Sequence, residues 1–383
     1  MLANKMRLKR ITSLCLVTAS LILFAGCQSQ TSNTPALPEA ESGIAAETNT
    51  ATSTDKQTLK TVKFTLSWLL QGVDAPLTFA IDKGYFANEG VNVQYQRGYG
   101  SADALAKIAA GQYDMGLGDI YSMIEFNQKN PDQKLVAIAV PFNKAPYAIV
   151  ALKKSGINSA KQLEGKKLGA PAGDAPRRLW PVFAKQVGVD PSSANWITME
   201  PKLRESFLLQ GRVDAISGFS YTMLPSLIKG GAKLEDINVF YFSDNGLDYY
   251  GNAIIAKESF VKGNQELVKG FLKAYFKGFQ DALKDPTTGL DSVMANGDKL
   301  MSKEAEKLRL QIALDKLWVT PEVETVGIGG VDPQRLKKTL EQTVAGFGLK
   351  SNPAVETVFD GSFLPPKEER AIPPKSELKP LTK

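Results

Sequence analysis

From about residue 60 onward, short apolar runs alternate with segments whose apolar residues recur every three or four positions. The short runs are typical of strands and include residues 91–95, 135–140, 239–242 and 252–256. The run LVAIAV is continuously apolar, as is typical of a strand covered on both faces. Among the segments with helical periodicity, one begins with the candidate N-cap Ser101 and ends at Gly111. The alternation predicts an α/β fold with mainly parallel sheets flanked by helices.

One helix–turn–strand pattern occurs twice, one hundred residues apart. KIAAGQYDMGLGD is similar to FLLQGRVDAISGF, and each has a glycine, two residues and an aspartate: Gly111 with Asp114, and Gly211 with Asp214. The glycine suits a left-handed helix stop, and the aspartate suits the turn into a strand. The offset is too long for a solenoid repeat, so it predicts one copy in each of two lobes. Chance similarity between two common units is the alternative.

The last third of the chain carries three longer amphipathic patterns, at residues 259–286, 302–318 and 331–348. In the third, Asp332 has the N-cap position and Pro333 the first helical position. A helical end after two α/β lobes predicts a chain that returns to its first lobe and braces it.

The first 26 residues differ from all that follows. Residues 1–10 hold four positive charges and no negative one, and residues 11–26 are apolar, which is the pattern of a secretory signal peptide. The sequence LFAGC is similar to the lipobox of bacterial lipoproteins, which predicts that Cys27 is lipidated and becomes the mature N-terminus. Cleavage as an ordinary signal peptide is the alternative. Residues 27–59, rich in Ser, Thr, Ala and Pro, predict a flexible tether.

Composition narrows the function classes. The 383 residues are 43% hydrophobic, which is enough for sizeable cores. The net charge of +6 falls to +2 without the four charges of residues 1–10, so there is no basis for nucleic-acid binding. The chain has no histidine, and its two cysteines, Cys15 and Cys27, precede the expected folded region. We therefore expect no His-dependent catalysis, no cofactor and no metal centre with imidazole or thiolate ligands.

Two stretches carry a family resemblance. Residues 74–119, from DAPLTFAIDKGYFANEGV to AAGQYDMGLGD, and residues 162–173, QLEGKKLGAPAG, resemble the substrate-binding proteins of bacterial ABC importers. The most similar groups are binders of nitrate, alkanesulfonate and taurine and the thiamin-pyrimidine-synthase-like proteins. The resemblance runs over residues 60–260 and more loosely beyond. It implies a two-lobed periplasmic-binding-protein fold with two inter-lobe crossings, near 147–154 and 250–258.

This resemblance also implies a domain order and a setting. Lobe 1 would comprise residues 60–150 and a helical return at 256–365, lobe 2 residues 151–255, and a C-terminal tail residues 366–383. The protein would work outside the cytoplasm, lipid-anchored through Cys27 on the periplasmic side of a bacterial membrane. The implied partners are a small-molecule ligand and ABC permease subunits, with the binding protein a monomer.

Trp68 and Asp74 lie where the first predicted strand gives way to a helix, which is where ligands bind in open α/β sheets. Trp68 offers a flat face for stacking, and Asp74 a charge-assisted acceptor for a ligand N–H. In the synthase-like relatives a histidine often occupies the position of Asp74, so ligand identity does not transfer. The alternatives are a core role for Trp68 and a helix N-cap role for Asp74.

Three further candidates follow the next strands of lobe 1. Gly100 and Ser101 lie at a strand-to-helix turn, where free backbone N–H groups attract an anionic or strongly polar ligand group. A plain serine cap is the alternative. Asp119 ends the strand MGLGD at the expected edge of the cleft.

The remaining candidates come from lobe 2 and the return crossing. GDAPRRLWP contains Asp174 and the adjacent Arg177 and Arg178, of which at most one faces the cleft. We assign the site role to Arg177, pairing with an acidic ligand or locking the lobes, while the sequence leaves open which of the two faces the cleft. A solvated basic face is the alternative. Tyr249 and Asn252 are candidates to close over the ligand.

These residues suit two ligand classes. An aromatic wall with a carboxylate suits a nitrogen heterocycle such as an aminopyrimidine, which we rank first. An arginine with a helix N-terminus suits a sulfonate, nitrate or carboxylate. A thiamin-pyrimidine-synthase-like enzyme is a further reading that the absence of histidine disfavours, and a sensor lipoprotein feeding a receptor is another.

Overall fold

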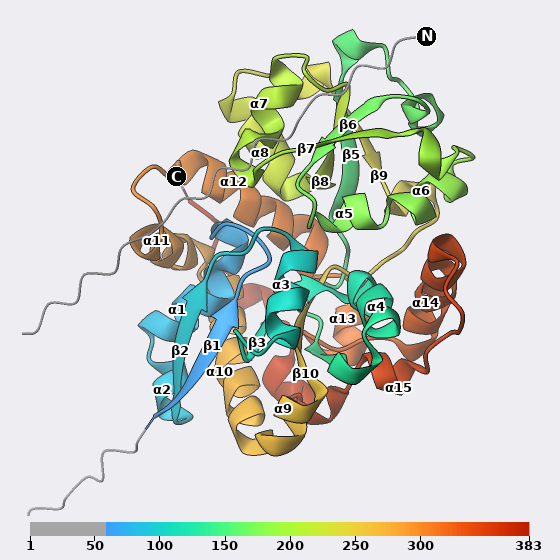
Figure 1. Ribbon diagram of the computed structural model, residues 1–383. Helices are drawn as coiled ribbons and strands as arrows, with labels where there is room; N and C mark the ends of the chain where they lie inside the picture. The colour runs from blue at the N-terminus through green and yellow to red at the C-terminus, as the bar shows by residue number, and fades with distance from the viewer. Residues whose placement is uncertain (1–58, 383) are drawn as a thin grey trace, which may run out of the picture. The chain divides into compact units, whose positions relative to one another are not determined.

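Two five-stranded sheets form the framework of the molecule (Figure 1). The computed structural model describes residues 59–382, which lie within one compact unit. The predicted signal peptide, the lipidation site Cys27 and nearly all of the predicted tether therefore lie outside the described residues. Sheet 1 has the strand order β2-β1-β3-β10-β4, and sheet 2 has the order β7-β6-β8-β5-β9.

Each sheet is built mainly from one stretch of chain. Sheet 1 contains β1 (Lys60–Thr65), β2 (Val91–Gln96), β3 (Met115–Asp119), β4 (Leu135–Ala139) and β10 (Asn252–Lys257). Sheet 2 contains β5 (Tyr147–Leu152), β6 (Lys167–Ala170), β7 (Asn195–Thr198), β8 (Ala215–Phe219) and β9 (Ile237–Tyr241). We call the parts around these sheets lobe 1 and lobe 2. The connecting residues 140–146 are the first crossing, and residues 242–251 are the second crossing.

Four strands of each sheet run in one direction and the fifth runs against them. In sheet 1, β1 is parallel to β2 and β3, whereas β10 is antiparallel to β3 and β4. In sheet 2, β6 is parallel to β7 and β8, whereas β5 is antiparallel to β8 and β9. The prediction of mainly parallel sheets is confirmed, with the exception of the one strand that enters each sheet from a crossing. The lobe limits predicted at 150 and 255 fall inside β5 and β10 and stay predictions.

The repeated glycine–aspartate unit occupies equivalent places in the two lobes. Gly111 and Gly211 have left-handed backbones, with φ of 74° and 68°. Asp114 accepts a hydrogen bond from the backbone N–H of Lys63 in β1, and Asp214 accepts one from Lys167 in β6, both at 2.8 Å. Each aspartate therefore ties the strand that follows it to a parallel neighbour in the same sheet, β1 in lobe 1 and β6 in lobe 2, and the prediction of one copy per lobe is confirmed.

Helices cover both sheets and form the C-terminal return (Figure 1). Lobe 1 begins with α1 (Ala75–Asp82), α2 (Tyr85–Asn88), α3 (Ser101–Ala109) and α4 (Ile120–Lys129). Lobe 2 has α5 (Ala175–Arg178), α6 (Trp180–Gln186), α7 (Arg204–Leu209) and α8 (Ser220–Lys229). The return contains α9 (Glu258–Gly263), α10 (Gln265–Lys284), α11 (Pro286–Asn296), α12 (Lys303–Ala313), α13 (Pro321–Val326), α14 (Pro333–Phe347) and α15 (Val355–Val358).

The return braces both lobes, whereas the sequence predicts bracing of lobe 1. α10 packs against α1 in lobe 1, but α12 contacts α8 and α14 contacts α6, both in lobe 2. As predicted, Asp332 is the N-cap of α14, where its carboxylate accepts a hydrogen bond from the backbone N–H of Arg335 at 2.7 Å, and Pro333 is the first helical residue.

The contact between α1 and α10 depends on a glycine. A Cβ atom on Gly278 would lie 2.4 Å from the carbonyl oxygen of Pro76 and 2.6 Å from the Cβ of Ala80. A Cβ atom on Gly263, at the end of α9, would meet nothing within 4 Å among the described residues. The two glycines therefore differ in packing although both are helical.

We predict that Gly278→Ala lowers the free energy of unfolding by roughly 1–3 kcal/mol, because the added methyl group forces α1 and α10 apart. Gly263→Ala is the matched control. It should leave stability unchanged or raise it by up to about 1 kcal/mol, since alanine restricts the unfolded chain more than glycine does. Urea denaturation followed by tryptophan fluorescence measures both variants. Equal stability of the two would contradict this packing.

Candidate functional site

Two adjoining cavities lie between the lobes. The inner cavity has a volume of about 10 Å³, the space of one water molecule, and its walls are Ser67, Trp68, Gly100, Ser101, Asp174, Ala175, Arg204, Phe219 and Thr222. The outer cleft has a volume of about 890 Å³ and is bounded by residues within 66–71, 95–97, 201–209, 222–230 and 296–309. Most inner-cavity residues lie just beyond a strand, in the crevice outside the strand ends where open α/β sheets bind ligands.

Trp68 belongs to the walls of both cavities. β1 ends at Thr65, and the following turn is held by hydrogen bonds from the N–H of Gly98 to the carbonyl of Trp68 and from the N–H of Gly100 to that of Ser67. The indole is partly exposed, so Trp68 is not a core residue. The guanidinium carbon of Arg204, from lobe 2, lies 4.8 Å from the ring centroid. Trp68 therefore joins the two lobes at the boundary between the cavities.

Gly100 and Ser101 lie where the two lobes touch. Gly100 has φ of 117°, and a Cβ atom there would lie 2.2 Å from the carbonyl oxygen of Gly173 in lobe 2. That same carbonyl accepts a hydrogen bond from the N–H of Ala102 at 3.2 Å. The expectation that Ser101 caps α3 is wrong, because Gly100 is the N-cap and Ser101 is the first helical residue. The Ser101 hydroxyl is buried in the inner-cavity wall and has no hydrogen-bond partner among the described residues.

Arg204 is a site residue that the sequence does not reveal. Its side chain is 1% exposed, and it forms ion pairs with Asp174 at 3.5 Å and with Glu205 at 2.6 Å. It also donates to the carbonyl oxygen of Ser217 at 3.3 Å. In the sequence, KLRESFLL gives only the pattern of an ordinary helix start with adjacent opposite charges. No local sequence pattern predicts that the guanidinium at the first residue of α7 is buried.

Asp174 lines the inner cavity, as the sequence predicts for a cleft residue. It caps α5 by accepting from the N–H of Arg177 at 3.0 Å, and it accepts from the hydroxyl of Ser217 at 2.7 Å. Burial raises the pKa of its carboxyl group, and the nearby guanidinium of Arg204 opposes this rise. Asp174 thus serves first as the counter-charge of Arg204.

The two adjacent arginines point to different places. Arg177 donates to the carbonyl of Ala170 at 2.8 Å and to the hydroxyl of Thr198 at 3.0 Å, so it packs along sheet 2 and lines neither cavity. The assignment of the site role to Arg177 is therefore not supported by its position. Arg178 instead reaches Glu125 on α4 of lobe 1, with an ion pair of 2.6 Å. The inter-lobe lock that we assigned to Arg177 is formed by its neighbour.

Asp74 lies beneath the cleft wall and lines neither cavity. It has the N-cap position of α1, but its carboxylate accepts a hydrogen bond from the preceding N–H of Gln71 at 2.9 Å. Burial raises the pKa of Asp74 to about 7; the bond from Gln71 opposes this shift and the nearby carboxylate of Glu306 adds to it. Its side chain is engaged by the protein itself, and a direct contact between Asp74 and a ligand stays a prediction.

A second inter-lobe connection lies beside Asp74, at the outer cleft. Glu306 on α12 accepts a hydrogen bond from the N–H of Gly72 at 2.8 Å and pairs with Arg309. Arg309 donates to the hydroxyl of Ser226 on α8 at 2.7 Å. The return helix α12 therefore links the loop after β1 to lobe 2.

Asp119, Tyr249 and Asn252 do not line either cavity. Asp119 caps α4 through the N–H of Ser122 at 2.6 Å and accepts from the hydroxyl of Tyr147, and burial raises its pKa. Tyr249 is fully buried and stacks on Tyr121, with ring centroids 4.1 Å apart. Asn252 donates to the hydroxyl oxygen of Ser67 at 2.7 Å, which places it directly behind the inner cavity. Its Oδ1 atom is buried without a partner among the described residues.

The described part of the chain has neither a metal-binding cluster nor a membrane-spanning helix. Among residues 59–382, no cluster of three or more acidic, histidine or cysteine side chains is placed to hold a metal ion. In the same residues, no helix combines the length and the apolar character that crossing a membrane requires.

The model of the NMT1/THI5-like family matches residues 72–288, more than half of the chain. The chain belongs to this family. The matched region runs from the turn after β1 to the beginning of α11, and it includes all of lobe 2 and both crossings.

Individual relatives include binding proteins and enzymes. The formylaminopyrimidine-binding protein of Halalkalibacterium halodurans is 24% identical over 318 residues, which are 82% of this chain and 94% of that protein. The riboflavin-binding protein RibY of Chloroflexus aurantiacus is 23% identical over 353 residues, 90% of this chain and 95% of that protein. A 4-amino-5-hydroxymethyl-2-methylpyrimidine phosphate synthase of Schizosaccharomyces pombe is 22% identical over 233 residues, 59% of this chain and 66% of that protein.

Solved structures agree with the predicted fold. The alkanesulfonate-binding protein SsuA of Xanthomonas axonopodis pv. citri, bound to MOPS, matches with a TM-score of 0.61 at 13% identity, over 78% of this chain and 98% of that protein. The chain therefore has the two-sheet fold of periplasmic binding proteins, as the resemblance implies.

We predict that Asp74→Asn stabilises the protein increasingly as the pH rises. The folded-state pKa of about 7 lies above the ordinary aspartate value of 3.8, so the wild type loses stability as the pH rises between those two values. Asparagine keeps the acceptor for Gln71 and does not ionise. The stability difference between variant and wild type should therefore be about 1–3 kcal/mol more favourable to the variant at pH 8 than at pH 5. Urea denaturation at both pH values measures it, and a pH-independent difference would refute it.

Proposed function

We propose that the protein is the solute-binding component of an ABC importer, which captures a small, flat heterocycle between its lobes outside the cytoplasm. The observation that carries this proposal is the inner cavity, which is built from both lobes; the cation that lines it among residues 59–382, Arg204, is already paired with two carboxylates. A site formed by two lobes connected through crossings is suited to capture by hinge closure.

The polar groups of the site favour a neutral or donor-bearing ligand over an anion. Arg204 is satisfied by Asp174 and Glu205, and releasing it to an anion would leave buried carboxylates without their counter-charge. The N-terminal N–H groups of Gly100 and Ala102 donate to the carbonyls of Ser67 and Gly173. Arg204 and two of the backbone N–H groups at this turn are therefore engaged within the protein.

The shape of the two cavities suggests how such a ligand lies. The inner cavity holds no more than one small polar group, whereas the outer cleft has the volume typical of a small-molecule site. Trp68 and Thr222 line both. We place a flat ring against Trp68 in the outer cleft, with a small substituent directed into the inner cavity beside the unpartnered hydroxyl of Ser101.

The ligands for which two relatives are named support this class, because formylaminopyrimidine and riboflavin are both nitrogen heterocycles. A non-enzymatic role is supported by the absence of histidine from the whole sequence, since histidine is the commonest general acid–base group. The ligand should accordingly be released unchanged. Binding of a sulfonate or other anion is the second candidate, because Lys202 and Lys229 are exposed and line the outer cleft.

We predict that Trp68→Ala weakens binding of the heterocycle by about 5- to 150-fold, the loss of roughly 1–3 kcal/mol of stacking. A thermal-shift screen of aminopyrimidines and riboflavin, with MOPS as the sulfonate probe, first identifies the ligand, because a hundredfold excess over Kd adds about 2.7 kcal/mol. Calorimetric titration then compares the variants. Trp196→Ala, in lobe 2 and away from both cavities, is the control and should bind normally. Stabilisation by MOPS alone would favour the anion candidate.

The lipid anchor is a separate proposal supported by the sequence LFAGC at Cys27. We predict that Cys27→Ser moves the protein from the membrane fraction to the soluble extracytoplasmic fraction, because the thioether-linked lipid is lost. Immunoblotting of fractionated cells measures the distribution, with Cys15→Ser as the control that should stay membrane-bound. An intact Cys27→Ser protein that remains with the membrane would exclude this anchor.

A further inference from the structure

The backbones of the two crossings pair with each other on the way between the lobes. The N–H of Ala145 in the first crossing donates to the carbonyl of Tyr249 in the second at 2.9 Å. The N–H of Gly251 in the second crossing donates to the carbonyl of Phe142 in the first at 2.8 Å. Any hinge motion between the lobes must change backbone angles within or beside this paired region.

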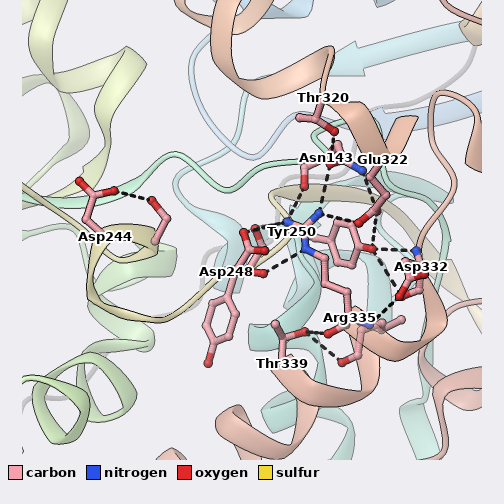
Figure 2. Close-up of polar contacts among 12 residues, drawn as sticks. Asn143, Asp244, Asp248, Tyr250, Thr320, Glu322, Asp332, Arg335 and Thr339 are labelled. Carbon is pink, nitrogen blue, oxygen red and sulfur yellow. Dashed lines mark hydrogen bonds and ion pairs between the residues drawn. The ribbon is translucent and has the colours of Figure 1, made fainter. Parts of the chain in front are cut away.

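One guanidinium holds both crossings at this point (Figure 2). Arg335, in the first turn of α14, donates through Nη2 to the carbonyl of Asn143 at 2.9 Å in the first crossing and to that of Tyr249 at 3.2 Å in the second. Its Nε donates to the carbonyl of Asp248 at 3.2 Å. Three backbone carbonyls from two separate segments thus converge on a single side chain, whose exposed fraction is 15%.

Side chains fix the guanidinium in this position. Its Nη1 donates to Oδ1 of Asn143 and to Glu322, both at 3.1 Å. The ring of Tyr250 lies 4.0 Å from the guanidinium carbon, and the Tyr250 hydroxyl donates to Glu322 at 2.6 Å and accepts from the N–H of Asp332 at 2.8 Å (Figure 2). Arg335 is therefore oriented by both crossings, by α13 and by the start of its own helix.

The far end of α14 is fixed to lobe 2. A Cβ atom on Gly346 would lie 2.4 Å from a side-chain carbon of Val182 on α6. Lys185, also on α6, donates to the carbonyl of Gly346 at 2.8 Å. The helix that carries Arg335 thus connects the crossings to lobe 2.

We infer that Arg335 is a positioning residue that sets the balance between open and closed lobes from outside the cleft. The planar guanidinium offers five N–H groups in a fixed fork, so it satisfies carbonyls of both crossings over a narrow range of their relative positions. That range includes the arrangement in which Gly100 touches Gly173. Loss of the fork widens the range and lowers the fraction of molecules able to bind, which raises the apparent Kd in proportion.

The experiment compares Arg335 with a matched arginine of the C-terminal segment that follows the return. Arg370 is buried and also donates to three carbonyls, those of Pro365, Val326 and Ile328, none of which lies in a crossing. Arg335→Lys and Arg370→Lys both keep the charge and remove the fork. Both should lower the melting temperature, so melting alone does not separate the hinge role from a structural role.

The decisive readout is the distance between the lobes without ligand. Spin labels at Lys202→Cys in lobe 2 and Gln96→Cys in lobe 1, both lining the outer cleft, are measured by double electron–electron resonance in a chain whose native cysteines are serine. Arg335→Lys should extend the distribution to longer distances, and Arg370→Lys should match the parent. An unchanged distribution in Arg335→Lys, or an equal shift in Arg370→Lys, would overturn the inference.

The effect on affinity rests on the proposed function and is measured separately. With riboflavin or an aminopyrimidine as the probe, Arg335→Lys should raise Kd by about tenfold. This is the rise expected when the fraction of molecules able to bind falls to about one tenth of its value in the parent. Arg370→Lys should leave Kd unchanged. If no heterocycle binds any variant, the proposed function fails while the distance experiment still tests the hinge. If Kd is unchanged despite longer distances, Arg335 does not set affinity.

Discussion

The pairing of the two crossings is the constraint on which the arrangement of the site depends. Hydrogen bonds between Ala145 and Tyr249 and between Gly251 and Phe142 hold the segments side by side, and β5 and β10 begin immediately after them. Because each of these strands lies inside a sheet of one lobe, the orientation of the crossings determines how the two sheets face each other. The contact between Gly100 and Gly173 leaves no room for a side chain, so small errors in this orientation would separate the cavity walls.

The internal repeat explains why the inner cavity has its composition. Trp68 follows β1 in lobe 1, and Asp174 follows β6 in lobe 2. Ser101 begins the helix after β2 in lobe 1, and Arg204 begins the helix after β7 in lobe 2. Corresponding strand ends of the two lobes therefore meet, where lobe 1 offers an aromatic face and a hydroxyl and lobe 2 an ion pair.

The positions of the strand ends were predictable from the sequence. The burial of the charged side chains near them, and the groups with which these side chains pair, were not. Alternating periodicity located β1 and the turn before α3, and so placed Trp68 and Gly100 at the site. A carboxylate after a strand has two physical outcomes, however: it faces a ligand or it satisfies nearby N–H groups. Asp119 accepts a hydrogen bond from an N–H group of α4, and Asp74 accepts one from the N–H of Gln71, because these donors lie within reach. Arg204 was missed since its counter-charges come together only in the folded chain.

The ion pairs of Arg204 also bear on which class of ligand the proposed site between the lobes can accept. A buried guanidinium is stable only when its charge is balanced, and Asp174 and Glu205 provide this balance without any ligand. The lobes thus meet around a group of charges that is already satisfied, and a ligand contributes surface contact and hydrogen bonds rather than missing charge. Under that condition an uncharged ring loses less solvation on entry than an anion does, and it has no need to displace a carboxylate. Under the proposed function, the preference for a heterocycle over an anion then follows from a pairing inside the protein that is set before any ligand arrives.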